Sequence, residues 1–417
     1  MTEVKPQGSA APADVIDPRL LIREHGARGY VEVLRRRVRG GELGALPVII
    51  GLIAIWIIFQ SLNDRFLSAQ NLTNLSLQIA ATGTISVGIV LVLLLGEIDL
   101  SVGSVSGLAA AILAVLNVNQ GFSAPLAILL AVLAGTGVGL VHGFVFAKIG
   151  VPAFVVTLAG LIGWQGLQLY VLGRQGTINI PFNGGVAKLT TTYFSDAVGY
   201  VIGVVIVALY LLAVLNETRR RSAAGLPVRP VSELVVRVGG LAVGVFAAIV
   251  VLNSYRGVPL AMVIFIGFVV FFDLLLRKTR YGRSIFAVGG NVEAARRAGI
   301  NVAAIRISVF MLASTLAAAG GVLATSRLFA ANQSSGAADV LLNAIAAAVI
   351  GGTSLFGGRG STYAALLGML VIGSISNGMF LIQVNADVRF MITGAVLLAA
   401  VIIDSLSRRG RQATGRA

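Results

Sequence analysis

Residues 75–95 read LSLQIAATGTISVGIVLVLLL, a stretch without a single charged side chain. A helix needs about 20 mostly apolar residues to cross a bilayer, so this stretch is long enough to span one. Its apolar residues run on continuously instead of alternating with polar ones, which argues against a membrane β-barrel. The chain has eleven further apolar segments, near 46–61, 98–117, 123–147, 151–173, 196–215, 238–253, 258–276, 307–326, 341–356, 360–382 and 388–404. The sequence therefore predicts an all-α polytopic membrane protein.

The overall composition agrees with this class. Of 417 residues, 57% are hydrophobic and only 12% are charged, and the mean hydropathy is +0.91. These values exclude a soluble enzyme, a disordered chain and a secreted disulfide scaffold. The sequence holds no cysteine and only two histidines, His25 and His142. We therefore expect no metal site and no cofactor, and we interpret His142 as a packed or interfacial residue.

Positive charge is concentrated in a few hydrophilic stretches. Of the 32 Lys and Arg residues, 24 lie in four stretches, 1–45, 216–237, 277–306 and 405–417. Basic loops stay in the cytoplasm, so membrane topology explains the net charge of +15 better than nucleic-acid binding does. No cleavable signal pattern opens the chain. We expect a basic cytoplasmic tail at 1–45, a transmembrane domain at 46–405 with cytoplasmic loops 216–237 and 277–306, and a basic cytoplasmic tail at 406–417.

Two apolar segments, 98–117 and 341–356, are short or glycine-rich. Each adjoins a polar break, GEIDLSVGS at 96–104 and GGTSLFGGRG at 351–360. Such segments could be half-helices, so the expected number of spans is 10 to 12. Discontinuous helices in the two halves of a chain point to a transport site. The similarity of the two breaks leaves an internal repeat open.

The first break carries the carboxylates Glu97 and Asp99. They are two residues apart, so they would not share a helix face. Asp99 or Ser101 is placed to cap the next helix by accepting from its free N–H groups. A direct role in the substrate path is the alternative. Elsewhere, glycines at 135, 139 and 143 lie on one helix face, which favours close helix packing or, alternatively, a dimer contact.

ATP cannot be bound here by a P-loop. The motif needs Gly-Lys, and none of the four lysines, Lys5, Lys148, Lys188 and Lys278, follows a glycine. Any ATP-driven activity therefore requires a partner. Within 277–306, Glu293-Ala294-Ala295 precedes Gly299, a pattern typical of a short helix closed by a left-handed glycine. This helix is either a docking site for a cytoplasmic partner or a solvated connection.

Several stretches, in this order along the chain, resemble the sugar permeases of ATP-binding-cassette transporters. They are GEIDLSVGS, VPAFVVTLAG (151–160), NSYRGVP (253–259), YGRSIFAVGGNVEAARRAGINV (281–302) and AIAAAVIGGTSLFGGRGS (344–361). The resemblance covers roughly 46–405, in the branched-chain amino acid/ribose/xylose permease family. The basic insertion 216–237 makes the chain most similar to the D-xylose type.

The resemblance implies a homodimeric permease in a bacterial inner membrane, surrounded by lipid. A separate ATPase would dock below it, and an extracytoplasmic binding protein would deliver the sugar. Coupling to the ATPase is then expected at Gly289, Gly290, Asn291, Glu293, Ala294, Ala295, Arg296 and Gly299. A neutral sugar needs hydroxyl and amide partners. The candidate path residues are Glu97, Asp99, Ser101, Trp164, Gln165, Asn343, Thr353, Ser354 and Asn377.

Other functions remain in competition at this point. A permease for ribose, galactose or another monosaccharide is the nearest alternative to D-xylose. An ion-coupled secondary transporter would need a titrating group in the membrane, for which Glu97 and Asp99 are the candidates. A membrane-embedded enzyme would need a nucleophile, a base or a metal set, and the sequence supports none of these.

Overall fold

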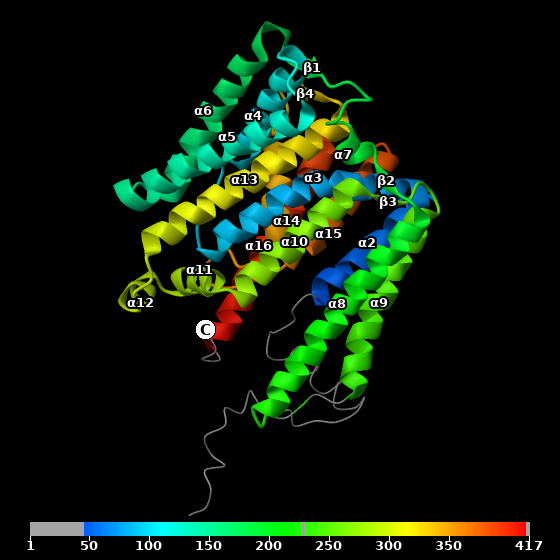
Figure 1. Ribbon diagram of the computed structural model, residues 1–417, viewed down its shortest axis with the longest axis vertical. Helices are drawn as coiled ribbons and strands as arrows, with labels where there is room; N and C mark the ends of the chain where they lie inside the picture. Colours follow the sequence, from blue (N-terminus) through cyan, green and yellow to red (C-terminus); the bar gives the residue numbers. More distant parts are fainter. Residues whose placement is uncertain (1–45, 227, 229–230, 414–417) are drawn as a thin grey trace, which may run out of the picture. The chain divides into compact units, whose positions relative to one another are not determined.

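The computed structural model describes residues 46–226, 228 and 231–413. Helices dominate it, and each of the twelve predicted apolar segments contains a helix (Figure 1). The first six are α2 (Leu46–Leu62), α3 (Ala69–Leu94), α4 (Val102–Ala114), α5 (Ala124–Phe144), α6 (Ala153–Leu172) and α8 (Asp196–Ala223). The others are α9 (Val231–Asn253), α10 (Leu260–Lys278), α13 (Val302–Leu328), α14 (Ala338–Ile350), α15 (Tyr363–Leu381) and α16 (Ala386–Ala413). The prediction of an all-α polytopic membrane protein is confirmed.

Within the described residues, nine helices are long and apolar enough to cross a membrane. The α2 and α14 helices are apolar but shorter. With 13 residues, α14 is about 20 Å long, well short of a hydrocarbon core about 30 Å thick. The α4 helix also has only 13 α-helical residues, and five π-helical residues, Val115–Asn119, extend it. Of the two weak segments, α14 is therefore a short helix that ends at a break, whereas α4 begins at a break but, with its extension, is one of the nine helices long enough to cross a membrane.

The chain divides into two compact units. Among the described residues, the smaller one comprises Ala197–Val250, the greater part of α8 and α9. In this unit Gly203 faces Phe246 and Ile249, so the missing side chain lets the two helices meet. Helix extends well into the predicted loop 216–237, because α8 ends at Ala223 and α9 begins at Val231. The larger unit comprises Leu43–Asp196 and Val251–Ala417.

The core of the larger unit is built around α3, of which most residues are buried. The α10, α13, α14 and α15 helices pack against it, and Figure 1 shows α13 running beside α3 and α5. The glycines at 135, 139 and 143 form the contact between α5 and α13. A Cβ at Gly139 would collide with Met311 Cα at 2.7 Å, and one at Gly143 with Ile307 Cα at 2.7 Å. The packing interpretation of this glycine stripe is thus confirmed.

Short strands tie the polar connections together. The β1 strand (Thr177–Asn179) pairs antiparallel with β4 (Ala330–Asn332), with Ile178 opposite Ala331. The β2 strand (Tyr193–Phe194) pairs with β3 (Val258–Pro259). The single-turn helix α7 (Lys188–Thr191) lies between β1 and β2 in sequence. The connections 174–195 and 327–340 are therefore held together by strand pairing.

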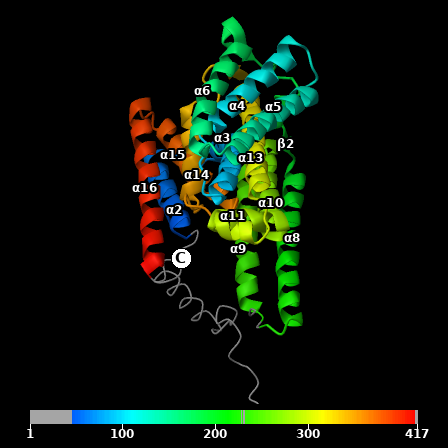
Figure 2. The same ribbon diagram turned by 90° about the vertical axis from the view of Figure 1, so that its left-hand side faces the viewer.

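At the other end of α13, the predicted loop 277–306 is largely helical. It contains α11 (Arg280–Gly290) and α12 (Val292–Arg297). Figure 1 shows both near the N-terminal end of α13, and Figure 2 shows α11 below α3 and α13. The α16 helix continues to Ala413, so helix also extends into the predicted C-terminal tail.

Candidate functional site

Polar side chains recur along one face of α3, near its N-terminus. Asn71, Asn74 and Gln78 are spaced by three and four residues, which places them on neighbouring turns of the same face. Ser68 starts the helix, because its side chain accepts a hydrogen bond from Asn71 N at 3.3 Å. A mostly buried helix thereby presents a row of amides at one end.

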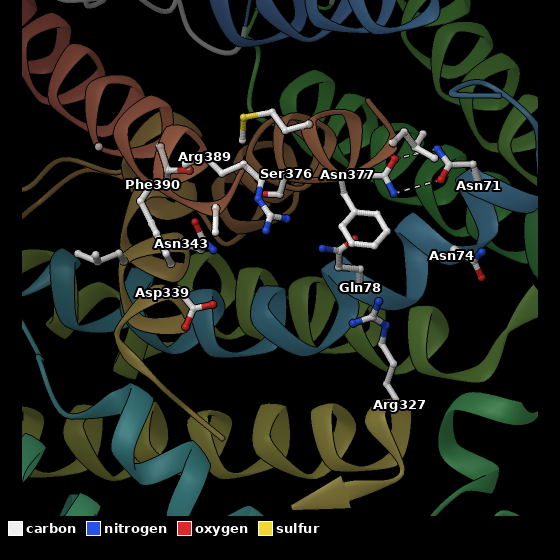
Figure 3. Close-up of a pocket in the computed structure, with 17 residues that line it drawn as sticks. Asn71, Asn74, Gln78, Arg327, Asp339, Asn343, Ser376, Asn377, Arg389 and Phe390 are labelled. Atoms are coloured by element: carbon white, nitrogen blue, oxygen red, sulfur yellow. Dashed lines mark hydrogen bonds between the residues drawn. The ribbon is translucent and has the colours of Figure 1, made fainter. Parts of the chain in front are cut away.

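This row forms one wall of a pocket with a volume of about 700 Å³ (Figure 3). The other walls come from the end of α13, the start of α14, the end of α15 and the start of α16. The polar lining residues are Asn71, Asn74, Gln78, Arg327, Asp339, Asn343, Ser376, Asn377, Arg389 and Thr393, and Phe380 and Phe390 add aromatic surface. Neutral amides and hydroxyls outnumber the charged groups, which suits a small, hydroxyl-rich ligand.

Two amides of the pocket are already bonded to each other. Asn71 Nδ2 donates to Asn377 Oδ1 at 2.8 Å, and Asn377 Nδ2 donates to Asn71 Oδ1 at 3.1 Å. Asn71 Nδ2 also donates to the Phe66 carbonyl at 2.7 Å. This pair fixes α3 to α15 at the edge of the pocket. It leaves Asn377 less free to bind a ligand than the sequence alone suggests.

Asn343 differs from this pair. Its Oδ1 is buried, and no partner for it exists among the described residues. An unpaired buried acceptor costs about 1–3 kcal/mol, so a ligand hydroxyl that donates to it would recover that free energy. Asp339 lies one turn before Asn343 on α14. Across the pocket, the guanidinium of Arg327 points toward Gln78 (Figure 3).

The structure brings only two of the predicted path residues, Asn343 and Asn377, to this pocket. Gln165 is exposed on α6. Thr353 and Ser354 lie in the turn after α14, where Thr353 is buried. Four others, Glu97, Asp99, Ser101 and Trp164, lie at or near the break between α3 and α4.

At this break a chain of hydrogen bonds links four buried or half-buried side chains. Asp99 Oδ1 accepts from Ser101 N at 2.8 Å and from Ser101 Oγ at 2.6 Å. Ser101 Oγ lies 3.3 Å from His142 Nδ1, and Trp164 Nε1 donates to His142 Nε2 at 2.8 Å. His142 is thus a packed residue, as predicted. Burial raises the pKa of Asp99 above its usual range, because the charged carboxylate loses water.

The prediction that Asp99 or Ser101 caps α4 through its side chain is wrong. Ser101 is the N-cap residue of α4, but its side chain makes no capping hydrogen bond. Its hydroxyl instead donates to Asp99, the strongest acceptor nearby. Asp99 in turn binds the N–H of Ser101, one position before the helix begins. The carboxylate therefore shapes the turn that precedes α4 and does not bind the helix's own first N–H groups.

Glu97 and Asp99 lie in the non-helical turn between α3 and α4, and Glu97 contacts a different helix from Asp99. Its Oε1 lies 3.7 Å from Arg306 Nη2 of α13, and the same guanidinium stacks 4.5 Å from the centre of the Phe146 ring. Burial raises the pKa of Glu97, and the Arg306 charge offsets part of that rise. Glu97 therefore connects the break to Arg306 of α13, whereas Asp99 connects it through Ser101 to His142 of α5.

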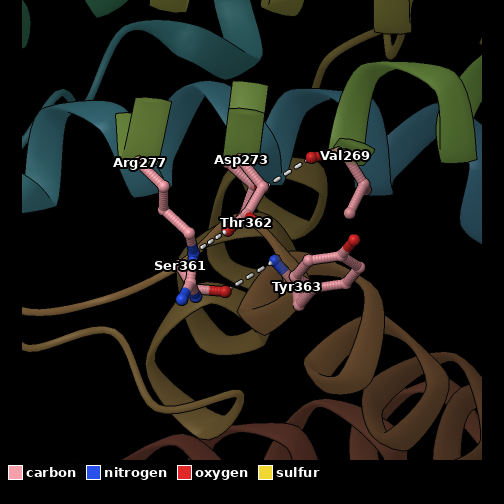
Figure 4. A network of polar contacts seen from close by, with 6 residues as sticks. All are labelled: Val269, Asp273, Arg277, Ser361, Thr362 and Tyr363. Atoms are coloured by element: carbon pink, nitrogen blue, oxygen red, sulfur yellow. Dashed lines mark hydrogen bonds and ion pairs between the residues drawn. The ribbon is translucent and has the colours of Figure 1, made fainter. Parts of the chain in front are cut away.

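The second break, between α14 and α15, is held by α10 (Figure 4). Thr362 Oγ1 donates to the Val269 carbonyl at 2.6 Å, and Ser361 Oγ accepts from Tyr363 N at 3.1 Å. One turn further along α10, buried Asp273 forms an ion pair with Arg277 at 2.8 Å. The start of α15 is thereby fastened to the helix that leads into α11.

The α12 helix is short but capped at both ends. Asn291 Oδ1 accepts from Ala294 N at 2.9 Å at its start. At its end, Gly299 has a φ of +80°, with Gly299 N bonded to Arg296 O and Ile300 N bonded to Ala295 O. This is a Schellman motif, so the predicted glycine-terminated helix is confirmed. Glu293 and Arg296 form an exposed ion pair at 2.8 Å, and Ala294 is also exposed, whereas Ala295 is buried.

The two predicted glycines at the end of α11 are not equivalent. A Cβ at Gly289 would overlap the Leu94 carbonyl oxygen, whereas a Cβ at Gly290 would meet nothing within 4 Å. Gly289 is therefore an internal packing position, and the predicted coupling residues divide into an exposed surface on α12 and a buried contact on α11.

Several pocket residues were not singled out from the sequence. The signal for Asn71, Asn74 and Gln78 was present, because amides at helical spacing interrupt an apolar segment. Arg327, Asp339, Arg389 and Phe390 gave no such signal. They lie on three separate helices, and only the fold gathers them.

The fold and these sites define a multi-pass membrane permease with a polar pocket at one end and a short, surface-lying helix at the other. The family model described as branched-chain amino acid transport system, permease component, matches residues 71–401. The chain belongs to this family of permease subunits. No solved structure matches it.

Similar proteins within the family are named as sugar permeases. The xylose transport system permease protein XylH of Haemophilus influenzae is 36% identical over 368 residues, covering 87% of this chain and 97% of the relative. XylH of Escherichia coli is 37% identical over 373 residues, covering 88% and 93%. The ribose import permease protein RbsC of Bacillus subtilis is 31% identical over 364 residues, covering 87% and 94%.

Proposed function

We propose that this chain is the membrane-spanning subunit of an ATP-binding-cassette importer for a neutral monosaccharide, with D-xylose as the first candidate. The pocket formed by α3, α13, α14, α15 and α16 carries this proposal, because its polar lining is mostly amide and hydroxyl. Such groups bind sugar hydroxyls without the cost of burying a charge that the ligand cannot neutralise. The xylose permease relatives support the choice of sugar.

The transport cycle would alternate access between the two ends of α3. The pocket lies at its N-terminal end, and the break beginning at Gly96 lies about 30 Å away, the thickness of a hydrocarbon core. Reversing a 1:99 population of two states takes about 5.5 kcal/mol of differential binding. ATP bound to a partner, acting through α12, would supply that free energy. The exposed capped helix, with Asn291, Glu293 and Arg296 on it, is the docking surface we propose.

The remaining partners follow from the same assignment. An extracytoplasmic binding protein would deliver the sugar to the pocket end, and a second copy of the chain would complete the path in a homodimer within the lipid. The basic stretches support an orientation in which α12 and both termini would face the cytoplasm across a bacterial inner membrane. Glu97, Asp99, Ser101, Trp164, Thr353 and Ser354 would then act at the inner breaks, and Asn343 and Asn377 at the outer pocket.

Ribose is the second candidate substrate, because the ribose permease of Bacillus subtilis is also similar over most of the chain. Galactose or another monosaccharide comes next. An ion-coupled carrier would depend on Glu97 and Asp99. Glu97 has a cationic neighbour in Arg306. Asp99 Oδ1 accepts from Ser101, and only Asp99 Oδ2 is without a partner among the described residues, so the two carboxylates do not together form an ion site.

The test is purification in mild detergent with whatever ATPase accompanies the chain, followed by reconstitution into vesicles and measurement of labelled sugar uptake. We expect uptake of xylose that needs ATP and survives an ionophore, with ribose weaker and leucine not transported. Uptake by the chain alone, abolished by the ionophore, would overturn the ATP-driven assignment. Transport of leucine in preference to sugars would overturn the substrate class.

A further inference from the structure

Both helix breaks meet the end of α11 at a single point. Gly358, in the break after α14, donates its N–H to the Leu94 carbonyl at the end of α3, at 2.9 Å. Gly289 of α11 lies against that same carbonyl and against Gly358 N. Gly96 completes the group, because a Cβ on Gly357 would lie 2.8 Å from its nitrogen. We call Gly96, Gly289, Gly357 and Gly358 the glycine junction.

The junction is a contact of backbone on backbone. A Cβ on Gly289 would overlap the Leu94 oxygen, and one on Gly357 would lie 2.6 Å from the Gly289 oxygen. Gly96, Gly357 and Gly358 also have positive φ values of +78°, +83° and +70°. Side chains can change rotamer and absorb a displacement, whereas closely packed backbones transmit it. Glycine is the residue that permits both this proximity and these conformations.

The position of the junction links the two ends of the larger unit. On one side, α11 leads through Asn291 directly into α12, the proposed docking helix. On the other side, the α3 helix and the α14 helix both run from the junction region to the pocket, where they carry Asn74 and Asn343. The two helices that form opposing walls of the pocket thus both connect to Gly289, α3 directly and α14 through the break that follows it, at the end of α11 that leads into the proposed docking helix.

We propose that Gly289 is the positioning residue that transmits movement of the docking helix to both discontinuous segments at once, and that the glycine junction is the mechanical coupling of the transporter. This inference rests on the proposed function of the chain as an ATP-driven permease. It separates Gly289 from the exposed residues of α12. Those residues would bind the ATPase, whereas Gly289 would convert the bound state into movement of the pocket walls.

The experiment compares Gly289→Ala with Gly267→Ala in the complete transporter complex. Gly267 lies on an exposed face of α10, where a Cβ would meet nothing within 4 Å, so it controls for adding a methyl group to a helix. For Gly289→Ala we expect the complex to assemble and hydrolyse ATP. Sugar transported per ATP hydrolysed should fall about tenfold, while the KM for sugar changes by less than about twofold. Gly267→Ala should match the parent chain in all three quantities.

A folded Gly289→Ala complex with the parent ratio of sugar to ATP would overturn the inference. Absence of ATP-dependent uptake by the parent chain would instead refute the proposed function, so the two failures are distinguishable. If Gly289→Ala does not fold, Gly358→Asn replaces it, because Asn tolerates positive φ and its Cβ would lie 3.2 Å from Gly290 Cα. Its control is Gly352→Asn, at a φ of +102° in open space. Equal coupling ratios in this second pair would also contradict the inference.

Discussion

Asn71 and Asn377 exchange two hydrogen bonds, at 2.8 and 3.1 Å, across the contact between α3 and α15. Both side chains are buried, at 8% exposure each. A reciprocal amide pair satisfies a donor and an acceptor on each side. It therefore fixes the orientation of both side chains and the position of α3 relative to α15. Within the row of amides on α3, Asn71 is therefore a structural residue, whereas Asn74 and Gln78 line the pocket without being part of this pair.

Removing one partner of this pair should destabilise the fold. In Asn377→Ala the amide of Asn71 loses a donor and an acceptor in a buried site, so we expect the free energy of unfolding in detergent to fall by about 1–3 kcal/mol. The double variant Asn71→Leu/Asn377→Leu leaves no side-chain amide without its partner and removes only the donor to the Phe66 carbonyl, so it should lose less stability than the two single replacements added together. Asn119→Ala, an exposed amide change on the extension of α4, is the control. A single variant as stable as Asn119→Ala would show that the pair contributes little.

The Asn343 side chain should affect sugar affinity and not stability. Its Oδ1 has no partner among the described residues, so Asn343→Ala breaks no internal hydrogen bond made by that oxygen. We expect the KM for xylose uptake to rise about tenfold, the equivalent of about 1.4 kcal/mol for one hydrogen bond to the ligand. The unfolding temperature should not fall below the parent's, because the substitution removes a buried acceptor that has no partner among the described residues. An unchanged KM would remove Asn343 from the path.

The cap of α12 should control docking of the ATPase. Gly299 has a φ of +80°, where an L residue with a Cβ costs roughly 1–2 kcal/mol. Gly299→Ala should therefore weaken ATPase binding about 5- to 30-fold, measured by titration of the purified subunits. Gly299→Asn should lie between this variant and the parent, because Asn adopts the left-handed conformation more readily. Equal binding by all three proteins would mean that the helix does not need its Schellman end to dock.

Exchange of Glu293 tests the same surface through charge. Glu293→Gln removes the exposed ion pair with Arg296 but keeps the size of the side chain. Exposed pairs of this kind contribute little to stability, so unfolding should hardly change. We expect reduced sugar uptake per ATP hydrolysed, with normal insertion into the membrane. Fully coupled transport in this variant would exclude Glu293 from the docking surface.

The raised pKa of Glu97 should make the free energy of unfolding depend on pH. Its pKa is raised in the folded state, so the folded protein binds a proton there more tightly than the unfolded chain does. Its contribution is then fully present below the unfolded pKa of about 4.3 and is lost as pH rises through the folded value. In Glu97→Gln this loss is absent. The variant should gain stability relative to the parent as pH increases from about 4 to 8. Parallel pH profiles of unfolding for the two proteins would contradict this assignment.

The class of protein, the placement of its helices and the existence of two breaks were all predictable from local sequence. The length of an apolar segment, its glycines and its flanking charges are local properties of the sequence. They are enough to predict a spanning helix, because an α-helix makes all its backbone hydrogen bonds within one segment in hydrocarbon. The short α12 helix was also predictable, because the glycine that ends it is a local signal. The row of amides on α3 was also predictable, because Asn71, Asn74 and Gln78 are spaced by three and four residues.

The polar residues that share a site could be identified only once the chain was folded. Glu97, Asp99 and Ser101 look like pocket residues in the sequence, yet they lie at the opposite end of α3 from Asn343 and Asn377. Arg327, Asp339 and Arg389 belong to three helices, and nothing local relates them. Gly289 and Gly290 are adjacent and chemically identical, but one touches the Leu94 carbonyl and the other has open space around it. Such differences arise from long-range packing, in which a rotation of 100° per residue along a helix decides which of two neighbours meets another backbone.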